Sequence, residues 1–244
     1  MDLSLIFFFL FVLVVIQSIA GIGILVIGTP LLLIFNQDFV VILSILLPLS
    51  VTTSFSNLVY FNYKYKNKIK IDKEIKNYFF FICIPAIFLG LLLLKEFKNI
   101  INFKYLVSFI IFTSILFSNF KNKNKFINLN SEKIILFVVG IIHGVSNCGG
   151  SLLSLFLSNK SKMKFSRYSI TFFYLFLAMF QLIMFIILFD YNFSIKPDLI
   201  IYALSITLLG IFFGNYITKF INEKIFKQTI NVICIYTCIF LIIS

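Results

Sequence analysis

Two long apolar stretches of this chain are each interrupted near the middle by glycine and polar residues. The stretch 133–157 contains GIIHGVSNCGG, and the stretch 17–35 contains three glycines and a proline. Because the interior of a bilayer offers no water to an opened backbone, unwound peptide groups there must line a cavity or bind a ligand. One such break in each half of a chain is typical of the substrate sites of many transporters. The two breaks therefore predict a membrane carrier.

The composition of the chain is that of a helical membrane protein. Apolar residues make up 61% of the 244 positions and charged residues 12%, with a mean hydropathy of +1.07, which excludes a soluble domain. Since about 20 helical residues cross the hydrocarbon core, we expect an all-α, multi-pass protein of the inner cell membrane with about eight membrane segments. Short polar loops separate the apolar runs 3–35, 39–61, 78–94, 105–118, 134–157, 168–189, 199–218 and 228–243.

The distribution of Lys and Arg over the loops distinguishes two topologies. If all eight runs cross once, the alternating sides hold 11 and 10 of the 21 cations, which favours neither orientation. If the broken run 134–157 is instead a re-entrant hairpin, the loops 64–76, 121–133, 160–167 and 219–227 share one side. That side then holds 17 cations and the other side holds 4. Because cytoplasmic loops are enriched in Lys and Arg, we expect this hairpin, with the 17-cation side in the cytoplasm.

A second hairpin at 3–35 would divide the chain into two similar halves. Each half then has a hairpin and three crossings, and the odd number of crossings inverts the second half, as in many secondary transporters. GTPLLLIF at 28–35 and GGSLLSLF at 149–156 also resemble each other. We therefore expect one membrane domain of two inverted repeats. The N-terminal repeat is 1–120, with a hairpin at 3–35 and helices at 39–63, 78–95 and 104–119, and the C-terminal repeat is 121–244, with a hairpin at 134–157 and helices at 167–189, 198–218 and 227–243.

Motifs along nearly the whole chain resemble those of one family of membrane permeases. GIGILVIGTP at 21–30 is similar to that family's opening glycine-rich signature, and LLPLSVTTSFSN at 46–57 is similar to its proline-containing second helix. GIIHGVSNCGG at 140–150 and KMKFSRYSITFF at 162–173 resemble its glycine-broken hairpin and the basic helix start that follows. In the order and spacing of these motifs, the chain resembles the sulfite exporter TauE/SafE family, also called the TSUP family.

The resemblance implies a transport function. It implies a secondary permease or exporter of small sulfur-containing anions, such as sulfite or organosulfonates, coupled to a proton gradient. The sequence departs from the family pattern at Ile24 and Leu25, which replace glycines, and at Ser151 and Phe156, where glycine and proline are common. The class of transporter is therefore better supported than the substrate.

Small residues at the two breaks are candidates for contact with an anionic substrate. A helix N-terminus attracts anions because its first N–H groups are unpaired. The hairpin at 134–157 would start a half-helix at mid-membrane, just after Asn147, and we expect Pro30 in the first turn of a second half-helix. The alternative is that these small residues only allow close helix packing. The candidates are Gly28, Thr29, Pro30, Asn147, Gly149, Gly150 and Ser151.

Polar residues inside the crossings give further candidates. Hydroxyls in the segment 50–57 can bond back to their own helix, whereas Asn57 is costly to bury and should face a pore or another helix. The only histidine, His143, either carries a coupled proton or bridges two helices. The resemblance places Arg167 beside the second hairpin, where it either attracts anions or anchors a helix end. The candidates are Thr52, Thr53, Asn57, Arg167 and Thr171 for the substrate and His143 for the proton.

Other classes of function fit the sequence less well. The sequence has no nucleophile–base pair, phosphate-binding glycine loop or metal-ligand cluster, so we expect neither an enzyme nor a metal or other cofactor. Lys and Arg lie in loops or at helix ends, so the net charge of +12 indicates contact with lipid and not with nucleic acid. The expected partners are a small anion and the bilayer. A membrane assembly factor or scaffold that transports nothing is the alternative.

Overall fold

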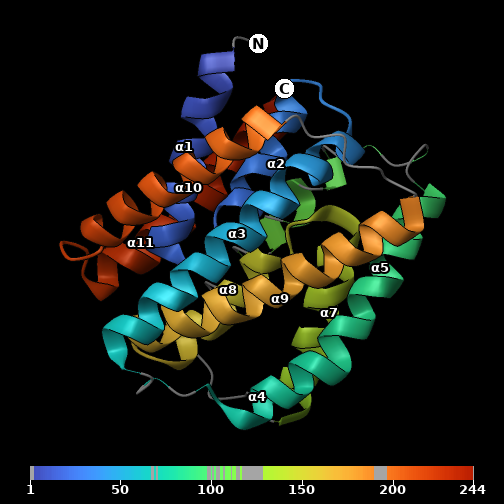
Figure 1. Cartoon of the computed structure of the whole chain (residues 1–244). Coiled ribbons are helices and arrows are strands. Elements are labelled where there is room, and N and C mark those ends of the chain that lie inside the picture. Colours follow the sequence, from blue (N-terminus) through green and yellow to red (C-terminus); the bar gives the residue numbers. More distant parts are fainter. Residues whose placement is uncertain are drawn as a thin grey trace.

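The computed structural model of the chain is a bundle of α-helices, with no strand among its described residues (Figure 1). It describes residues 3–66, 69, 71–97, 100, 102, 105–106, 108–110, 112–113, 116, 129–189 and 197–243. The helices are α1 Leu3–Ala20, α2 Ile24–Ile34, α3 Phe39–Tyr65, α4 Lys73–Tyr78, the π-helix η1 Phe79–Cys83, α5 Ile84–Phe97, α7 Leu129–Ser146, α8 Gly149–Lys160, α9 Met163–Phe189, α10 Pro197–Ile217 and α11 Glu223–Ile243. Half of the predicted helix 104–119 lies outside the described residues, and its described positions are helical.

Each of the two interrupted stretches has a break between two helices, and both breaks contain a residue in the left-handed conformation. α1 ends where Gly21 adopts a left-handed conformation, with a φ of 81°, and α2 starts shortly after it. α7 ends at Asn147, which has a φ of 65°, and α8 starts at Gly149. Glycine and asparagine adopt this conformation most readily, and it ends a helix. The two pairs also match in length, with 18 and 11 residues in α1 and α2 and 18 and 12 in α7 and α8.

The outer ends of the α7–α8 pair lie together. Lys160, at the end of α8, forms an ion pair with Glu132 in the first turn of α7. The neighbouring Lys133 lies over the ring of Tyr78, 5.1 Å from the ring centroid. α7 therefore runs inward and α8 returns toward the same end. α7 begins five residues before the predicted hairpin 134–157, because the residues 129–133 (LNSEK) contain no helix breaker and continue the helix.

Acidic caps position the starts of two other helices. The side chain of Asp38 accepts a hydrogen bond from the amide of Val40 at 2.7 Å, where α3 begins. Asp72 accepts one from the amide of Glu74 at 2.9 Å, where α4 begins. Such caps stabilise a helix start by about 0.5–2 kcal/mol. Both caps lie in polar connections and so fix where the apolar helices begin.

Helices from one half of the chain pack against helices from the other half. α3 packs along α9, and the two run side by side across the view in Figure 1. α1 packs on α10, and α5 packs on α7. α11 packs on α2, and α2 also touches α8. The first helix of each broken pair thus lies against a crossing of the other half.

Glycines bring these helices close together. A Cβ added at Gly90 of α5 would lie 2.4 Å from the carbonyl oxygen of Ile141 in α7. A Cβ added at Gly214 of α10 would lie 2.6 Å from the Cβ of Ser18 in α1. Larger side chains at either glycine would push the helices apart, and small residues are common at such contacts in membrane proteins.

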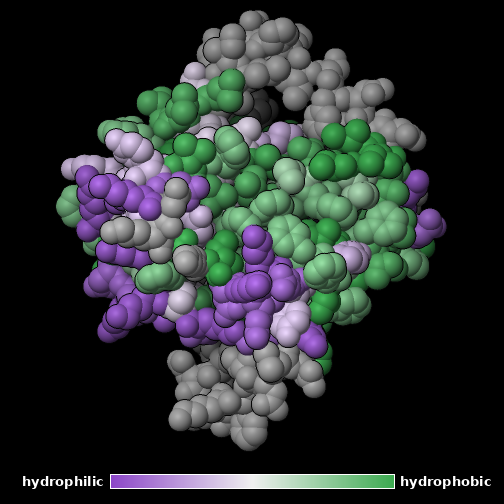
Figure 2. All heavy atoms as spheres, turned by 60° about the horizontal axis from the view of Figure 1, so that its bottom comes forward, coloured by the Kyte–Doolittle hydropathy of each residue, from purple (hydrophilic) through white to green (hydrophobic). Residues whose placement is uncertain are grey.

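Much of the outer surface is apolar. Among the described residues, three helices are long and apolar enough to span a membrane: Phe39–Tyr65, the continuous helix Lys73–Phe97 and Met163–Phe189. Shorter apolar helices occur at Phe7–Ala20, Ile24–Ile34 and Leu204–Ile217. Figure 2 shows broad hydrophobic areas, with hydrophilic residues gathered in the left and lower parts of the face. The all-helical architecture is compatible with the expected polytopic membrane protein.

Candidate functional site

The first half-helix, α2, begins in the interior of the protein. Its first turn is buried, and the amide of Ile24 donates to the side-chain oxygen of Gln17 at 3.1 Å. The amides of Leu25 and Val26 face the hydroxyl of Tyr174, from α9. The first amides of a helix have no partner within the helix, so they concentrate positive partial charge at this point.

The second half-helix, α8, begins beside the first. The buried side chain of Asn147 donates to the hydroxyl of Thr29 in α2 at 2.9 Å, and its oxygen Oδ1 has no partner. A Cβ added at Gly149 would lie 2.3 Å from a backbone oxygen of α7, so this glycine permits the tight return of the chain. The hydroxyl of Ser151 donates to the carbonyl of Cys148 at 2.7 Å, within the start of its own helix. The start of α8 is thus tied to the middle of α2.

Tyr174 lies between the two half-helix starts. It is fully buried, and a Cβ added at Gly150 would lie 2.1 Å from a carbon of its ring, so the ring rests on the first turn of α8. Its hydroxyl faces the first turn of α2 and has no hydrogen-bond partner. The sequence does not predict this residue, because an aromatic side chain in an apolar run is ordinarily a packing residue. The adjacent glycines 149 and 150, which leave room for a ring, are the only sequence signal that could have suggested it.

A series of side-chain hydrogen bonds connects α1, α3, α10 and α9. The side chain of Asn57 donates to the hydroxyl of Ser18 at 3.0 Å and accepts from Asn215 at 2.9 Å. The oxygen Oδ1 of Asn215 accepts in turn from Arg167 at 2.9 Å. All four side chains are buried. Asn57 is a predicted site residue, whereas Ser18 and Asn215 are not predicted by the sequence.

Arg167, near the start of α9, is a buried cation held by neutral groups. It is 5% exposed, and its guanidinium donates to the carbonyl of Ser18, to Asn215 and, at 3.3 Å, to Thr218. The guanidinium carbon lies 4.7 Å from the ring centroid of Phe61, and the nitrogen Nε has no partner. None of the ion pairs in the described part of the chain includes Arg167. A guanidinium in this state keeps both its charge and a free donor for an oxyanion.

His143 lies one turn before the second break. Its side chain is fully buried, and neither ring nitrogen has a hydrogen-bond partner. The ring centroid lies 6.3 Å from that of Tyr174, and the backbone carbonyl accepts from Gln181 at 3.1 Å. The ring therefore makes no bridge between helices, and a role in carrying a proton stays a prediction.

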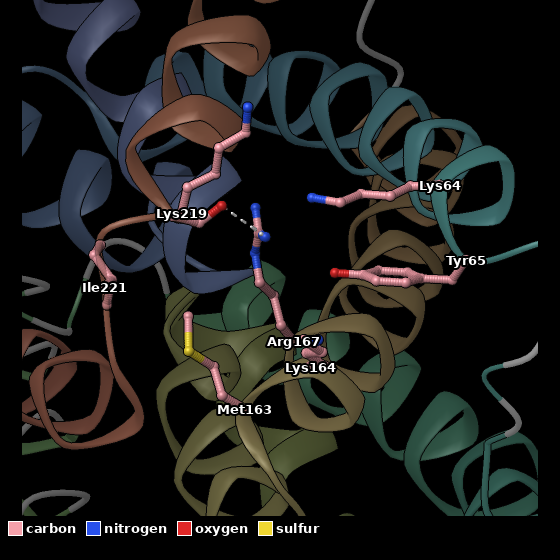
Figure 3. A pocket seen from close by; sticks show the side chains of 8 residues that line it. Lys64, Tyr65, Met163, Lys164, Arg167, Lys219 and Ile221 are labelled. Carbon is pink, nitrogen blue, oxygen red and sulfur yellow. Dashed lines mark hydrogen bonds between the residues drawn. The ribbon is translucent and has the colours of Figure 1, made fainter.

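A pocket of about 280 Å³ opens between the ends of α3, α9 and α10 (Figure 3). Its charged lining residues are Lys64, Lys164, Arg167 and Lys219. The three lysines are exposed and Arg167 is buried, so the pocket leads from a basic rim to the guanidinium. In Figure 3 the side chains of Lys64 and Tyr65 point toward Arg167. The sequence predicts a functional role only for Arg167, because the lysines are also what a cytoplasmic helix end would carry.

A comparison with protein families decides the class of this protein. A family model for the sulfite exporter TauE/SafE matches residues 5–241, nearly the whole chain. The chain belongs to the sulfite exporter TauE/SafE family. The predicted membership is thereby confirmed. No curated protein and no solved structure was found to match it. Since TauE/SafE proteins are permeases and exporters and not enzymes, this TauE/SafE chain is a membrane transport protein.

The first half-helix of this TauE/SafE protein begins earlier than predicted. Pro30 is not in the first turn of α2 but lies well inside the helix, because the backbone already opens at glycines 21 and 23. The atoms nearest to a Cβ added at Gly28 belong to side chains of α1 and α3, the nearest at 2.9 Å, so Gly28 lies in a packed contact and not at the start of the half-helix. The helix start that could attract an anion is therefore at residues 23–26 and not at 28–30.

The three predicted threonines in the crossings of this TauE/SafE protein differ in their surroundings. The hydroxyl of Thr52 donates to the carbonyl of Leu49 at 3.0 Å, within its own helix. The hydroxyl of Thr171 donates to the carbonyl of Arg167 at 2.8 Å and borders the break at Gly21. The hydroxyl of Thr53 is buried and has no partner. Thr171 thus lies at the first break and Thr53 keeps a buried hydroxyl without a partner, whereas the bonding of Thr52 indicates only a structural role.

Proposed function

We propose that this protein is a secondary permease of the inner cell membrane that moves small sulfur-containing anions, such as sulfite or organosulfonates, coupled to an ion gradient. The observation that carries the proposal is that two buried half-helices, α2 and α8, start close together on either side of Tyr174. Each start presents backbone amides that lack intrahelical partners, and such groups bind sulfonate or sulfite oxygens well. In the membrane interior no water competes for them.

The charges around the breaks favour an anion over a cation. The buried polar side chains that connect to the breaks are neutral or, in the case of Arg167, positive. Among the described residues, the one buried carboxylate is that of Glu132, which is paired with Lys160 at the outer end of α7. A cation would meet an unfavourable field at Arg167, whereas an anion would be attracted.

We also propose that the chain consists of two inverted repeats, 1–120 and 121–244, in which α1–α2 and α7–α8 are re-entrant hairpins. The proposal is supported by the matching lengths of the two pairs and by their matching left-handed breaks. The reciprocal packing of α1 on α10 and of α7 on α5 supports it further. In this arrangement each hairpin can move with the crossing of the other half, which is a basis for alternating access.

For the coupling ion we propose a proton carried by His143. This residue is buried one turn before Asn147, and both of its ring nitrogens are without partners. Each nitrogen of a neutral histidine ring can act as a proton donor or acceptor, so the ring can bind and release a proton. A proton taken up there would add positive charge beside the start of α8 and so favour an anion in the site.

The hairpin topology predicts a specific labelling pattern. In a variant without native cysteines, single cysteines in 121–133 and 160–167 should resist an impermeant maleimide added outside, whereas a cysteine at Gln37 should react. The reason is that the ion pair of Lys160 with Glu132 places the ends of the hairpin together, on the side that carries most of the loop cations. Labelling of 121–133 but not of 160–167, or the reverse, would show that α7–α8 crosses the membrane completely.

Two variants of Asn147 test the proposed anion site. Asn147→Asp should reduce sulfite transport about tenfold or more, because a carboxylate at the start of α8 repels the substrate. Asn147→Ala should reduce it about fivefold, because it removes one hydrogen bond, to Thr29, worth about 1 kcal/mol, and places alanine at a left-handed backbone position. The Asp variant should therefore be clearly the more damaging of the two. The measurement is uptake of labelled sulfite into vesicles, normalised to inserted protein.

Asn36→Asp is the matched control for this pair. Asn36 has the same left-handed backbone, with a φ of 54°, but lies in the exposed connection between α2 and α3. The control should transport sulfite at the wild-type rate. Equal transport by the Asp and Ala variants of Asn147 would place the anion elsewhere in the protein.

A further inference from the structure

The basic pocket is lined by four cationic side chains whose charge no acidic residue among the described lining residues balances. They are Lys64, Lys164, Arg167 and Lys219. No acidic residue is among the described residues that line the pocket, and none of the described ion pairs includes one of the four. Like charges gathered around one cavity raise the local concentration of counter-ions. The pocket therefore attracts a solute with more than one negative charge.

Aromatic rings, and not carboxylates, contact two of the three lysines of the rim. The ammonium group of Lys64 lies 5.4 Å from the ring centroid of Tyr60 and 5.7 Å from that of Tyr65. The ammonium group of Lys219 lies 5.3 Å from the ring centroid of Tyr216. A ring face attracts a cation without neutralising it. Neither lysine is paired with a carboxylate among the described residues, and the side chain of Lys64 points toward Arg167 (Figure 3).

The inner end of the pocket is suited to an oxyanion. Arg167 is held by fixed neutral acceptors, and its Nε–H has no partner. A free N–H on a buried guanidinium can donate to one oxygen of a sulfonate or sulfite group. The volume of about 280 Å³ is at the lower end for ligand sites and suits a small molecule.

The pocket adjoins the path to the half-helix starts. A Cβ added at Gly21, in the first break, would lie 3.3 Å from the carbonyl oxygen of Arg167 and 3.2 Å from the hydroxyl of Thr171. Tyr174 follows two turns further along the same face of α9, since seven residues make about two helical turns. An anion bound at Arg167 would thus lie about two turns of α9 away from the proposed central site. The pocket also lies at the end of the protein that the loop charges predict to be cytoplasmic.

We propose that the basic pocket is a cytoplasmic loading site that selects substrates by net charge. It accepts oxyanions with two negative charges in preference to those with one, and it rejects sulfonates that also carry an ammonium group. The lysines of the rim attract the second negative charge and repel an ammonium group. This inference rests on the proposed transport of sulfur-containing anions and adds the charge class of the substrate.

Three sulfonates with the same two-carbon frame test the selection. Sulfoacetate carries two negative charges, 2-hydroxyethanesulfonate carries one, and 2-aminoethanesulfonate is a zwitterion with none in net. Binding of each to the purified full-length protein is measured by calorimetry at low salt, where charges are least screened. Sulfoacetate should bind about tenfold more tightly than the hydroxy compound, and the amino compound should bind about tenfold more weakly still.

Neutralising the rim should remove the selection. In the double variant Lys64→Gln and Lys219→Gln, the ratio of the Kd values for the hydroxy compound and sulfoacetate should fall from about ten to about three or less. The matched control is Lys73→Gln with Lys76→Gln, which removes two exposed charges of α4 outside the pocket and should leave the ratio unchanged.

Each outcome decides the proposal. If the amino compound binds as tightly as sulfoacetate, or if the rim variant keeps the wild-type ratio, the loading site is wrong while the proposed anion transport stands. If none of the three sulfonates binds and sulfite does not bind either, the proposed function fails and the loading site fails with it.

Discussion

Replacing Arg167 with glutamine should reduce the rate of sulfite transport about a hundredfold. Among the described residues, Arg167 is the one buried cation, and it lines the basic pocket. A hydrogen bond from a charged donor to an oxyanion is stronger than a neutral one. Arg167→Lys should retain about a tenth of the wild-type rate, because the charge remains but the planar fork does not. The measurement is uptake of labelled sulfite into vesicles, normalised to inserted protein.

Thermal stability separates this effect from misfolding. Arg167→Gln removes a buried charge that has no carboxylate partner, but it also leaves the acceptors of Ser18 and Asn215 without their donor. Because the two effects oppose each other, the variant should remain folded with an unfolding temperature within a few degrees of the wild type, about 2–4 °C per kcal/mol. Sulfite should raise the unfolding temperature of the wild type and not that of the glutamine variant. Lys162→Gln is the control, since Lys162 is exposed just before α9 and does not line the pocket. A glutamine variant that transports sulfite at the wild-type rate would exclude Arg167 from the transport path.

Replacing Gly150 with alanine should reduce transport about fiftyfold. The new Cβ would lie 2.1 Å from the ring of Tyr174, a separation that real Cβ atoms do not show, so the ring or the start of α8 must move. Overpacking of this kind typically lowers the free energy of unfolding by about 1–3 kcal/mol, which a membrane-inserted bundle can tolerate. The displaced part is the region where the two half-helix starts meet, so the larger effect should be on transport.

Gly28→Ala is the matched control, because it makes the same change in the other half-helix. There the new Cβ would meet only the flexible ends of leucine side chains, at 2.9 Å, and transport should stay within about twofold of wild type. Both variants are compared by sulfite uptake and by unfolding temperature. Normal uptake by the Gly150 variant would show that the contact with Tyr174 has no part in transport.

The class of this protein could be predicted from its sequence because the relevant signals extend over many residues. The apolar runs and the two broken stretches are each recognised from many residues together, so no single position decides the prediction of a membrane protein. The order of the motifs gave the family, which the match over residues 5–241 confirms. The helical membrane class agrees with the three long apolar helices.

The position of the first half-helix could not be predicted in the same way. Pro30 has the stronger helix-breaking chemistry, since it lacks an N–H group. The chain nevertheless stays helical through Pro30 and opens at Gly21, where the backbone packs against α9. Which of two possible breaks forms thus depends on tertiary packing, and residue type alone does not decide it.

The hydrogen-bond partners of the site residues also could not be predicted from a single sequence. Asn57 and Asn215 are 158 positions apart, and Arg167 and Ser18 are 149 apart. These hydrogen bonds depend on how helices of the two halves pack together. The polarity of Asn57 indicates that it needs a partner, but not which residue that partner is.

Counterflow of labelled sulfite tests the central claim most directly. Purified protein is reconstituted into liposomes loaded with unlabelled sulfite and then diluted into a trace of labelled sulfite. A permease with a saturable anion site should accumulate the label transiently, and liposomes containing the Arg167→Gln variant should not. Accumulation no greater than in protein-free liposomes, for sulfite and for the three sulfonates alike, would contradict the assignment of this chain as a transporter of sulfur-containing anions.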